Sequence, residues 1–190
     1  MSSKSGGLFK NYNPEEFVSS QSQCKSSVAR AIRARILQDY PEMEEVLEHI
    51  LPKKQQLTVA KGQNHVQLLL DASGEVMFFQ HRDSGWYPSL RLAHRYPELM
   101  PTWQVDEGAI PHVLDGSNIF CAGFVNEQAA MDVDLEPGQP VVVMAHGKDH
   151  ACCVGLVKKS RDEIRAEPKG VGVEMMHYLN DGLWISPRVD

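Results

Sequence analysis

Two pairs of residues in the second half of the chain carry side chains that could do chemistry. Cys152 and Cys153 are adjacent thiols, and His146 and His150 are imidazoles four positions apart. Neighbouring residues of a strand point to opposite faces, so the two thiols are not expected to bind one metal or to form a disulfide. Free cysteines are also among the most buried residues. The sequence favours a buried structural role for both thiols over a catalytic or redox role.

The two histidines have the spacing of a zinc-binding helix, but the residues between them, GKD, are typical of a hairpin turn. Because no third ligand pattern lies nearby, we expect no metal site. Lys148 lies in the same turn and has two interpretations. It is either a solvated surface side chain or a cation at a barrel rim that meets a phosphate.

The sequence contains no GxSxG elbow, P-loop or dinucleotide-binding fingerprint. No nucleophile can be matched with a base and an orienting group from the sequence alone. We therefore expect no catalytic residue and no cofactor.

Lysines and arginines form local clusters although the net charge is −6. Residues 1–98 hold 12 Lys and Arg against 11 Asp and Glu (+1), and residues 99–190 hold 7 against 14 (−7). This balance excludes binding of nucleic acid through a global positive field. A single cluster is usually a solvated surface, but several together indicate a phosphate-rich partner. The clusters are Arg30 and Arg33; Lys53 and Lys54; Arg82, Arg91 and Arg95; and Lys158, Lys159, Arg161 and Arg165.

The first half of the chain predicts two helices, three strands and a third helix. A helix from Cys24 would place Val28, Ala31, Ile32 and Ile36 on one face, with Arg30 and Arg33 off it. PEMEEVLEHILP predicts a second helix over residues 41–52. Strands at 55–61, 65–71 and 76–82, separated by short turns, predict an antiparallel meander. A short helix should begin at Pro88, and the polar first dozen residues should form a loose tail.

The second half predicts short strands around two small helices. One helix should lie between Asp106 and Asp115, and a capping box at Ser160 and Glu163 should begin the other. Many short strands with turns between them are typical of a small barrel. The sequence thus predicts an α+β protein with a domain at 1–98 and a barrel at 99–190. The strands are expected near 103–105, 118–124, 140–145, 151–158, 171–179 and 183–186.

Composition places the chain among ordinary globular proteins. Hydrophobic residues make up 42% of it and charged residues 23%. No apolar run approaches the length of a membrane span, and the first residues do not resemble a signal peptide. Four cysteines without CxxC spacing fit a reducing compartment. We therefore expect a cytoplasmic protein without a membrane partner.

Several segments of the sequence together resemble a known family. VDEGAIPHVLDGSNIFCAGF, GKDHACCVG and PKGVGVEMMHYLNDGLW resemble a PUA domain, a small RNA-binding barrel. LPKK and GEVMFFQHRDSGWYPSLRLAHRYP are similar to the N-terminal domain of the malignant T-cell amplified sequence family of translation factors. The resemblance extends from about Cys24 to Trp184.

The resemblance implies a non-catalytic RNA-binding factor. Members act on the small ribosomal subunit with density-regulated protein, a SUI1-domain partner, in re-initiation and in recycling of deacylated tRNA. The barrel would approach the tRNA acceptor end through Gly108, Ala109 and Gly123, with Lys148 and His150 at the rim. Lys158 and Lys159 would also contact RNA. The basic residues Arg30, Arg33, Lys53, Lys54, Arg82, Arg91 and Arg95 would face ribosomal RNA.

Two other function classes remain open at this stage. PUA barrels also occur in RNA-modifying enzymes, so the chain could be an accessory protein or an enzyme subunit. It could also be an adaptor that binds only proteins. The glycines allow a second interpretation too, because a tight barrel needs small residues for its own packing.

Overall fold

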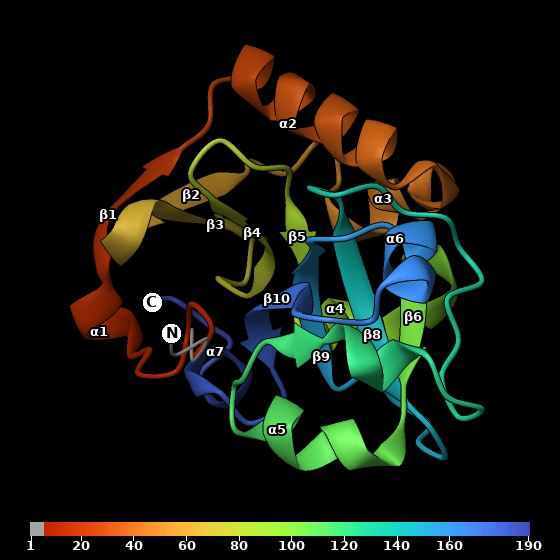
Figure 1. Cartoon of the computed structure of the whole chain (residues 1–190). Helices are drawn as coiled ribbons and strands as arrows, with labels where there is room; N and C mark the ends of the chain where they lie inside the picture. Colours follow the sequence, from red (N-terminus) through yellow and green to blue (C-terminus); the bar gives the residue numbers. More distant parts are fainter. Residues whose placement is uncertain (1–5) are drawn as a thin grey trace.

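The computed structural model describes residues 6–190 and contains two five-stranded sheets (Figure 1). The first sheet is fully antiparallel, with its strands in chain order. The predicted meander is confirmed as three of these strands. The polar edge strand β1 was missed because its sequence, VSSQSQ, lacks apolar alternation. The strands are β1 (Val18–Gln23), β2 (Thr58–Gly62), β3 (Val66–Leu70), β4 (Val76–His81) and β5 (Tyr87–Pro88).

Short helices and one long helix accompany this sheet. Pro88 belongs to β5, and the following helix begins after Ser89, whose hydroxyl accepts from the Leu92 amide at 3.2 Å. The predicted helix over 41–52 is interrupted, although its apolar positions Met43, Leu47 and Ile50 are buried. The helices are α1 (Pro14–Phe17), α2 (Ser26–Asp39), α3 (Leu47–Ile50) and α4 (Leu90–Arg95), with 3-10 turns η1 (Pro41–Met43), η2 (Gln63–His65) and η3 (Pro97–Leu99).

The buried face of α2 differs from the prediction. Val28 is 47% exposed, whereas Ala29, Ile32 and Ile36 are buried together with Arg33. The Arg33 guanidinium donates to the carbonyls of Leu51 (3.1 Å) and Pro52 (2.8 Å). Because these carbonyls accept hydrogen bonds from the guanidinium, an arginine can lie on the buried face of α2. The buried face therefore includes Arg33 and leaves Val28 outside it.

The second sheet has the order β6-β8-β9-β10-β7 and curls into a half-barrel, with β6 and β8 parallel and its other pairs antiparallel (Figure 1). The predicted α+β class with a PUA-type small barrel is confirmed. The strands are β6 (Thr102–Val105), β7 (Ile119–Phe120), β8 (Pro140–Ala145), β9 (Cys153–Val157) and β10 (Val171–Tyr178). The helical segments are η4 (Glu107–Ala109), α5 (Ile110–Leu114), η5 (Cys121–Phe124), α6 (Arg161–Ala166) and α7 (Gly182–Ile185).

Two predicted strands of the second half are wrong in part or in full. The strand expected at 118–124 is only two residues long and continues as the 3-10 turn η5. The strand expected at 183–186 is the helix α7, because the Asp181 carboxylate caps it by accepting from the Trp184 amide at 3.0 Å. The capping box at Ser160 and Glu163 is confirmed at the start of α6.

Both ends of the described chain join the two halves. The predicted loose tail is wrong from residue 6 onward, since Phe9 and Tyr12 are buried; its residues 1–5 lie outside the described part. At the other end, the C-terminal segment returns to the first sheet (Figure 1), where the Val76 amide donates to the Pro187 carbonyl and the Val189 amide to the Gly74 carbonyl, both at 2.9 Å. The segment 187–190, expected within the second domain, therefore pairs with the first.

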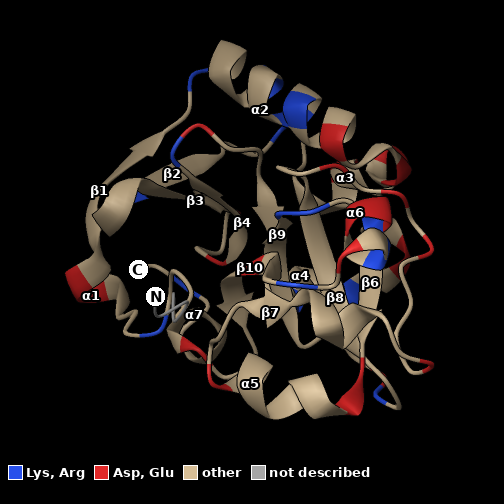
Figure 2. Ribbon diagram, in the orientation of Figure 1, with Lys and Arg blue, Asp and Glu red and all other residues tan. Residues whose placement is uncertain are grey.

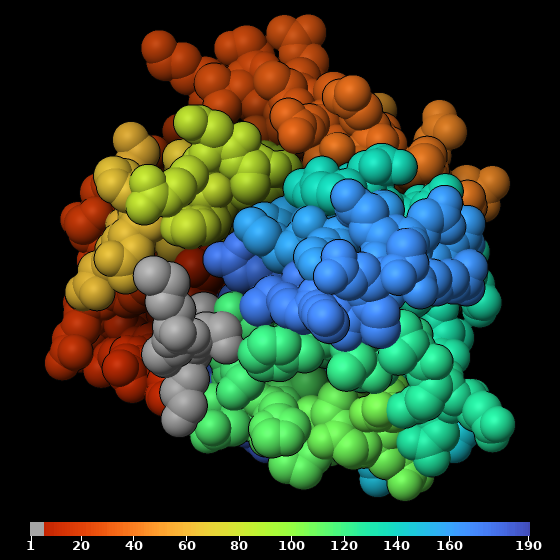
Figure 3. Space-filling model, viewed as in Figure 1, coloured from red at the N-terminus to blue at the C-terminus, as the bar shows by residue number. Residues whose placement is uncertain are grey.

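The first sheet ends with β5 and the second begins with β6. Residues 98 and 99 therefore lie in the segment between the two sheets. The apolar core does not divide so cleanly. Val154 and Met176 of the second sheet pack in the same buried cluster as Phe78 and Phe79 of the first, while Trp103 lies in a separate cluster inside the half-barrel. The halves are packed against each other over a shared apolar surface. Figure 3 shows segments of the two halves in contact on the face that it draws.

Candidate nucleic-acid interface

A cleft of about 460 Å³ lies between two short segments at the edge of the half-barrel. One wall is formed by η4 and α5, and the other by β7 and η5. Gly108 and Ala109 line the first wall and Gly123 lines the second. The structure therefore brings together three residues that the family resemblance placed in an RNA groove.

The glycines of this cleft are not explained by packing or by backbone conformation. Neither Gly108 nor Gly123 has a left-handed φ. A Cβ on Gly123 would lie 3.6 Å from the Ala109 Cβ, and one on Gly108 would lie 3.4 Å from the Asp106 Oδ1, which are ordinary contact distances. By contrast, a Cβ on Gly155 would lie 2.4 Å from Val173, so that glycine is required by the sheet. The two cleft glycines instead leave backbone accessible from the cleft.

Two further residues define what the cleft can bind. Asp106 caps η4 by accepting from the Ala109 amide at 2.9 Å, and its carboxylate also accepts from Asn126. Asp106 thus holds the first wall of the cleft in place. Phe120 lines the other wall and is 49% exposed, which is unusual for a phenyl ring in a small barrel. Exposed aromatic rings beside accessible backbone suit stacking of unpaired bases.

The turn between β8 and β9 separates the two residues expected at the cleft rim. It lies beside η4, because a Cβ on Gly147 would be 3.6 Å from the Glu107 carboxylate, and Lys148 is exposed there. His150, however, stacks on His94 of α4, with ring centroids 5.1 Å apart. The structure thus places His150 against the N-terminal half and not among the residues that line the cleft, a position that the sequence did not reveal.

Lys158 and Lys159 follow β9 and are partly engaged in contacts within the protein. Lys158 forms an ion pair with Glu174 at 3.6 Å, and Lys159 donates to the Lys169 carbonyl at 2.7 Å. Burial raises the pKa of the Cys121 thiol, and the Lys159 charge opposes that rise. A Cβ on Gly170 would lie 3.8 Å from the Lys159 Nζ, and the Gly170 carbonyl accepts from the Cys121 amide at 2.9 Å, so Lys159 lies near Cys121 at the end of the cleft wall.

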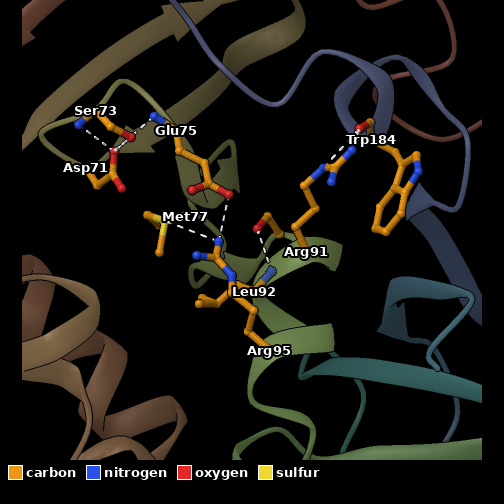
Figure 4. A network of polar contacts seen from close by, with 9 residues as sticks. Asp71, Ser73, Glu75, Met77, Arg91, Leu92, Arg95 and Trp184 are labelled. Carbon is orange, nitrogen blue, oxygen red and sulfur yellow. Dashed lines mark hydrogen bonds and ion pairs between the residues drawn. The ribbon is translucent and has the colours of Figure 1, made fainter. Parts of the chain in front are cut away.

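Three of the arginines expected to face ribosomal RNA form contacts within the protein, and Figure 4 shows two of them, Arg91 and Arg95. Arg33 is buried and donates to two carbonyls, as described above. Arg91 donates to the Trp184 carbonyl through Nε (3.1 Å) and Nη2 (2.6 Å), and its guanidinium lies 4.3 Å from the centroid of the Trp184 ring. Arg95 pairs with Glu75 at 2.7 Å. Arg33 is buried, and Arg91 and Arg95 have partners within the fold, so little of these guanidinium groups is free for RNA. Their contact with ribosomal RNA stays a prediction.

The remaining N-terminal candidates are exposed. Arg30, Lys53, Lys54 and Arg82 are exposed, and none of them forms an ion pair within residues 6–190. Figure 2 shows that basic segments are spread over several elements and do not gather on one. A phosphate-rich partner could therefore meet these cations only at separate points.

Both thiols, Cys152 and Cys153, are buried within the protein. Cys152 and Cys153 are buried in the same apolar cluster, and not on opposite faces as expected, because Cys152 precedes the strand. Burial raises the pKa of Cys153, which keeps that thiol protonated, and the Cys152 thiol donates to the Val143 carbonyl at 3.2 Å. In the described part of the chain, no group of three His, Cys, Asp or Glu residues is arranged to hold a metal ion.

Comparison with known proteins agrees with this geometry. Residues 12–97 match the Pre-PUA-like domain and residues 101–179 the PUA domain. A hypothetical protein of Pyrococcus horikoshii has a similar structure, with a TM-score of 0.70, 20% identity, and coverage of 88% of this chain and 99% of that one. A conserved PUA domain protein of Thermoplasma acidophilum has a TM-score of 0.62 at 25% identity, with coverage of 88% and 99%. Fold and cleft thus define a protein with a pre-PUA and a PUA domain, a combination that suggests RNA binding.

Sequence relatives narrow this class. The malignant T-cell-amplified sequence 1 homolog of Drosophila melanogaster is 44% identical over 182 residues, which cover 96% of this chain and 100% of that protein. The human malignant T-cell-amplified sequence 2 is 41% identical over 177 residues, covering 93% and 97%. The chain belongs to the malignant T-cell-amplified sequence family, and its family and PUA fold suggest a non-enzymatic factor.

Within residues 6–190, no helix has the length and apolar character needed to cross a membrane.

Proposed function

We propose that the protein is a non-catalytic translation factor that binds the small ribosomal subunit and the acceptor end of tRNA. In this proposal it acts with density-regulated protein, a SUI1-domain partner, in re-initiation and in recycling of deacylated tRNA in the cytoplasm. The single observation that carries the RNA contact is the cleft between η4–α5 and β7–η5. Its two glycines are required neither by packing nor by φ.

The properties of the cleft suit a single-stranded end more than a duplex. The cleft offers accessible backbone and an exposed ring, Phe120, but its lining includes the acid Asp106 and no lysine or arginine. Recognition of an unpaired RNA end uses stacking and hydrogen bonds to base edges, which need no dense positive charge. Lys148, on the turn next to η4, would contact the RNA backbone beside the cleft.

The N-terminal half supplies the electrostatic part of the proposal. Arg30, Lys53, Lys54 and Arg82 are exposed cations that would contact ribosomal RNA. Because the second half carries a net charge of −7, affinity for the subunit should come mainly from these residues and from the partner protein.

The first test measures sedimentation of the full chain with small ribosomal subunits, with and without the SUI1-domain partner. The second measures release of deacylated tRNA from post-termination subunits. The proposal expects co-sedimentation and tRNA release by the wild type. Phe120→Ala should reduce tRNA release with little loss of subunit binding, and Leu114→Ala, an exposed apolar change on α5 outside the cleft lining, serves as the matched control. Absence of subunit binding with the partner present would contradict the proposal.

A protein-only adaptor is the second candidate, and the charge of the half-barrel favours it. If crosslinking of the full chain recovers proteins but no RNA, the adaptor function replaces the proposed one. A change in the mass of RNA incubated with the pure protein would instead indicate an enzyme.

A further inference from the structure

A hollow of about 710 Å³ lies at one end of the N-terminal sheet, away from the cleft of the half-barrel. The turn from β2 to β3 forms one side of it, and the turn after β4 forms the other. Lys61 near the end of β2 and Arg82 on the turn after β4 are the lysine and arginine of its lining. The polar side chains of the lining are Lys61, Asn64, His65, Gln67 and Arg82, with one acid, Asp83, besides the hydroxyl of Ser19.

The backbone around this hollow is held in an unusual conformation. Asn64 (φ 56°), His65 (φ 61°) and Arg82 (φ 56°) are three of the four non-glycine residues with positive φ in residues 6–190. Residues with a β-carbon rarely adopt this region, and such residues concentrate at sites that bind ligands. The Arg82 amide donates to the His65 carbonyl at 2.9 Å, so the two turns are joined to each other.

The neighbouring edge strand fixes the third side of the hollow. The Ser19 hydroxyl of β1 donates to the Lys61 carbonyl at 3.0 Å. The Gln63 side chain donates to the Glu16 carbonyl at 3.0 Å. The hydrogen bonds therefore position the segments that carry Lys61, His65 and Arg82 before any ligand binds.

The lysine and the arginine of the hollow form no ion pair within the described residues, although the acid Asp83 lines the same hollow. The arginines and lysines with ion pairs in residues 6–190 are Arg35, Arg95, Lys158 and Arg161, and Lys61 and Arg82 are not among them. The pKa of His81 is lowered by burial and then by the positive charges of Arg82 and His65, against an opposing effect of Glu174. Arg82 and His65 thus lie close enough to His81 to act on its charge.

We propose that this hollow binds the phosphate backbone of an RNA strand through Lys61, His65 and Arg82. The inference rests on the proposed function, because it names the site through which the N-terminal half would meet RNA. Cations on two separate turns suit consecutive phosphates of a strand better than one free anion. The side-chain amides of Asn64 and Gln67, which also line the hollow, can form hydrogen bonds with ribose hydroxyls.

The test measures binding of a short labelled single-stranded RNA to the full chain over a range of salt concentrations. The double variant Lys61→Ala/Arg82→Asn removes both permanent charges, and asparagine tolerates the left-handed φ of position 82. The matched control Lys10→Ala/Lys25→Ala removes two exposed N-terminal lysines outside the hollow. Each lost phosphate contact should reduce the log–log salt slope by about 0.7, so the double variant should lose up to about 1.4.

The outcomes separate this site from the proposed function. A folded double variant with the slope of the wild type overturns the site, and so does an equal loss in the control. Inorganic phosphate and unlabelled RNA are also compared as competitors at matched ionic strength. If phosphate competes as well as RNA does, the hollow binds a free anion, and the proposal that it binds an RNA strand is wrong. If the double variant loses RNA affinity while the wild type fails to sediment with small subunits, the hollow is supported and the proposed function is wrong.

Discussion

Two groups of cations in the N-terminal half differ in what they bind. On α4, Arg91 donates to the Trp184 carbonyl and Arg95 pairs with Glu75, as Figure 4 shows. Around the hollow, Lys61 of β2 and Arg82 of the turn after β4 form no ion pair in residues 6–190 and are exposed. The bond from Arg91 spans 93 positions of sequence and joins α4 to α7.

The difference shows that a cluster of cations does not by itself form an electrostatic surface. A guanidinium that already has carbonyl and ring partners gains little from a phosphate, because that contact must replace the existing ones. Lys61 and Arg82 exchange only water for phosphate. The N-terminal half therefore engages one group of cations in contacts within the molecule and leaves the other exposed to solvent.

The largest effect on stability is expected for Arg91→Ala. The variant loses a charged donor to the Trp184 carbonyl and the contact with its ring, so the free energy of unfolding should fall by about 2–3 kcal/mol. Urea denaturation measures this loss, with Lys25→Ala as the control. Arg91→Lys should restore little, because an ammonium cannot reproduce the planar double contact. Normal stability with a shallower RNA salt slope would instead make Arg91 an RNA ligand.

The histidine stack beside Arg91 should make this contact region sensitive to acid. The pKa of His94 is lowered, chiefly by burial and also by the charges of His150 and Arg91, against a hydrogen bond to the Ala151 carbonyl. Below the ordinary value of 6.5 the unfolded chain binds more protons than the folded one, so stability falls as pH falls through the lowered pKa.

In His94→Gln the decline of stability between pH 6.5 and the lowered pKa should be shallower, with a total effect below that of Arg91→Ala. The pKa of His81 is lowered too, so a residual decline should remain. Unfolding midpoints over this pH range measure the effect, and His49→Gln on α3 removes an exposed imidazole as the control. A decline as steep as in the wild type would show that His94 is not the group responsible.

Arg95→Ala should change the free energy of unfolding by less than either Arg91→Ala or His94→Gln. Its ion pair with Glu75 is partly exposed, with side-chain exposures of 46% and 18%, and such pairs contribute about 0.2–1 kcal/mol. The loss should shrink at high salt, which screens the pair. A double-mutant cycle with Glu75→Gln measures the coupling, and a coupling that does not change with salt would contradict an electrostatic origin.

The smallest effect on stability is expected for Arg82→Asn. The side chain has no ion pair and asparagine suits φ 56°, so the free energy of unfolding should change by no more than about 0.5 kcal/mol. Its effect should appear in the salt dependence of subunit binding. If instead Arg82→Asn destabilises the protein as much as Arg91→Ala does, the comparison between the two groups fails.

The sequence alone determined the features that depend on neighbours within a few residues. The alternation and short turns of residues 55–82 predicted the meander, and Ser160 with Glu163 predicted the cap of α6. The family resemblance identified Gly108, Ala109 and Gly123, which the structure brings to one cleft. These features follow from local periodicity, capping and turn chemistry, or from a recognisable motif, and all of these are written in short stretches of chain.

Only the tertiary structure decided which side chains remain available. The apolar period of α2 could not show that Arg33 would be covered by the carbonyls of Leu51 and Pro52, and nothing near Arg91 in the sequence indicated Trp184. Lys61 and Arg82 are 21 positions apart and line one hollow because the end of β2 and the turn after β4 lie at the same end of the sheet. The partner of a long cationic side chain is set by whichever distant backbone packs beside it, and that depends on the complete fold.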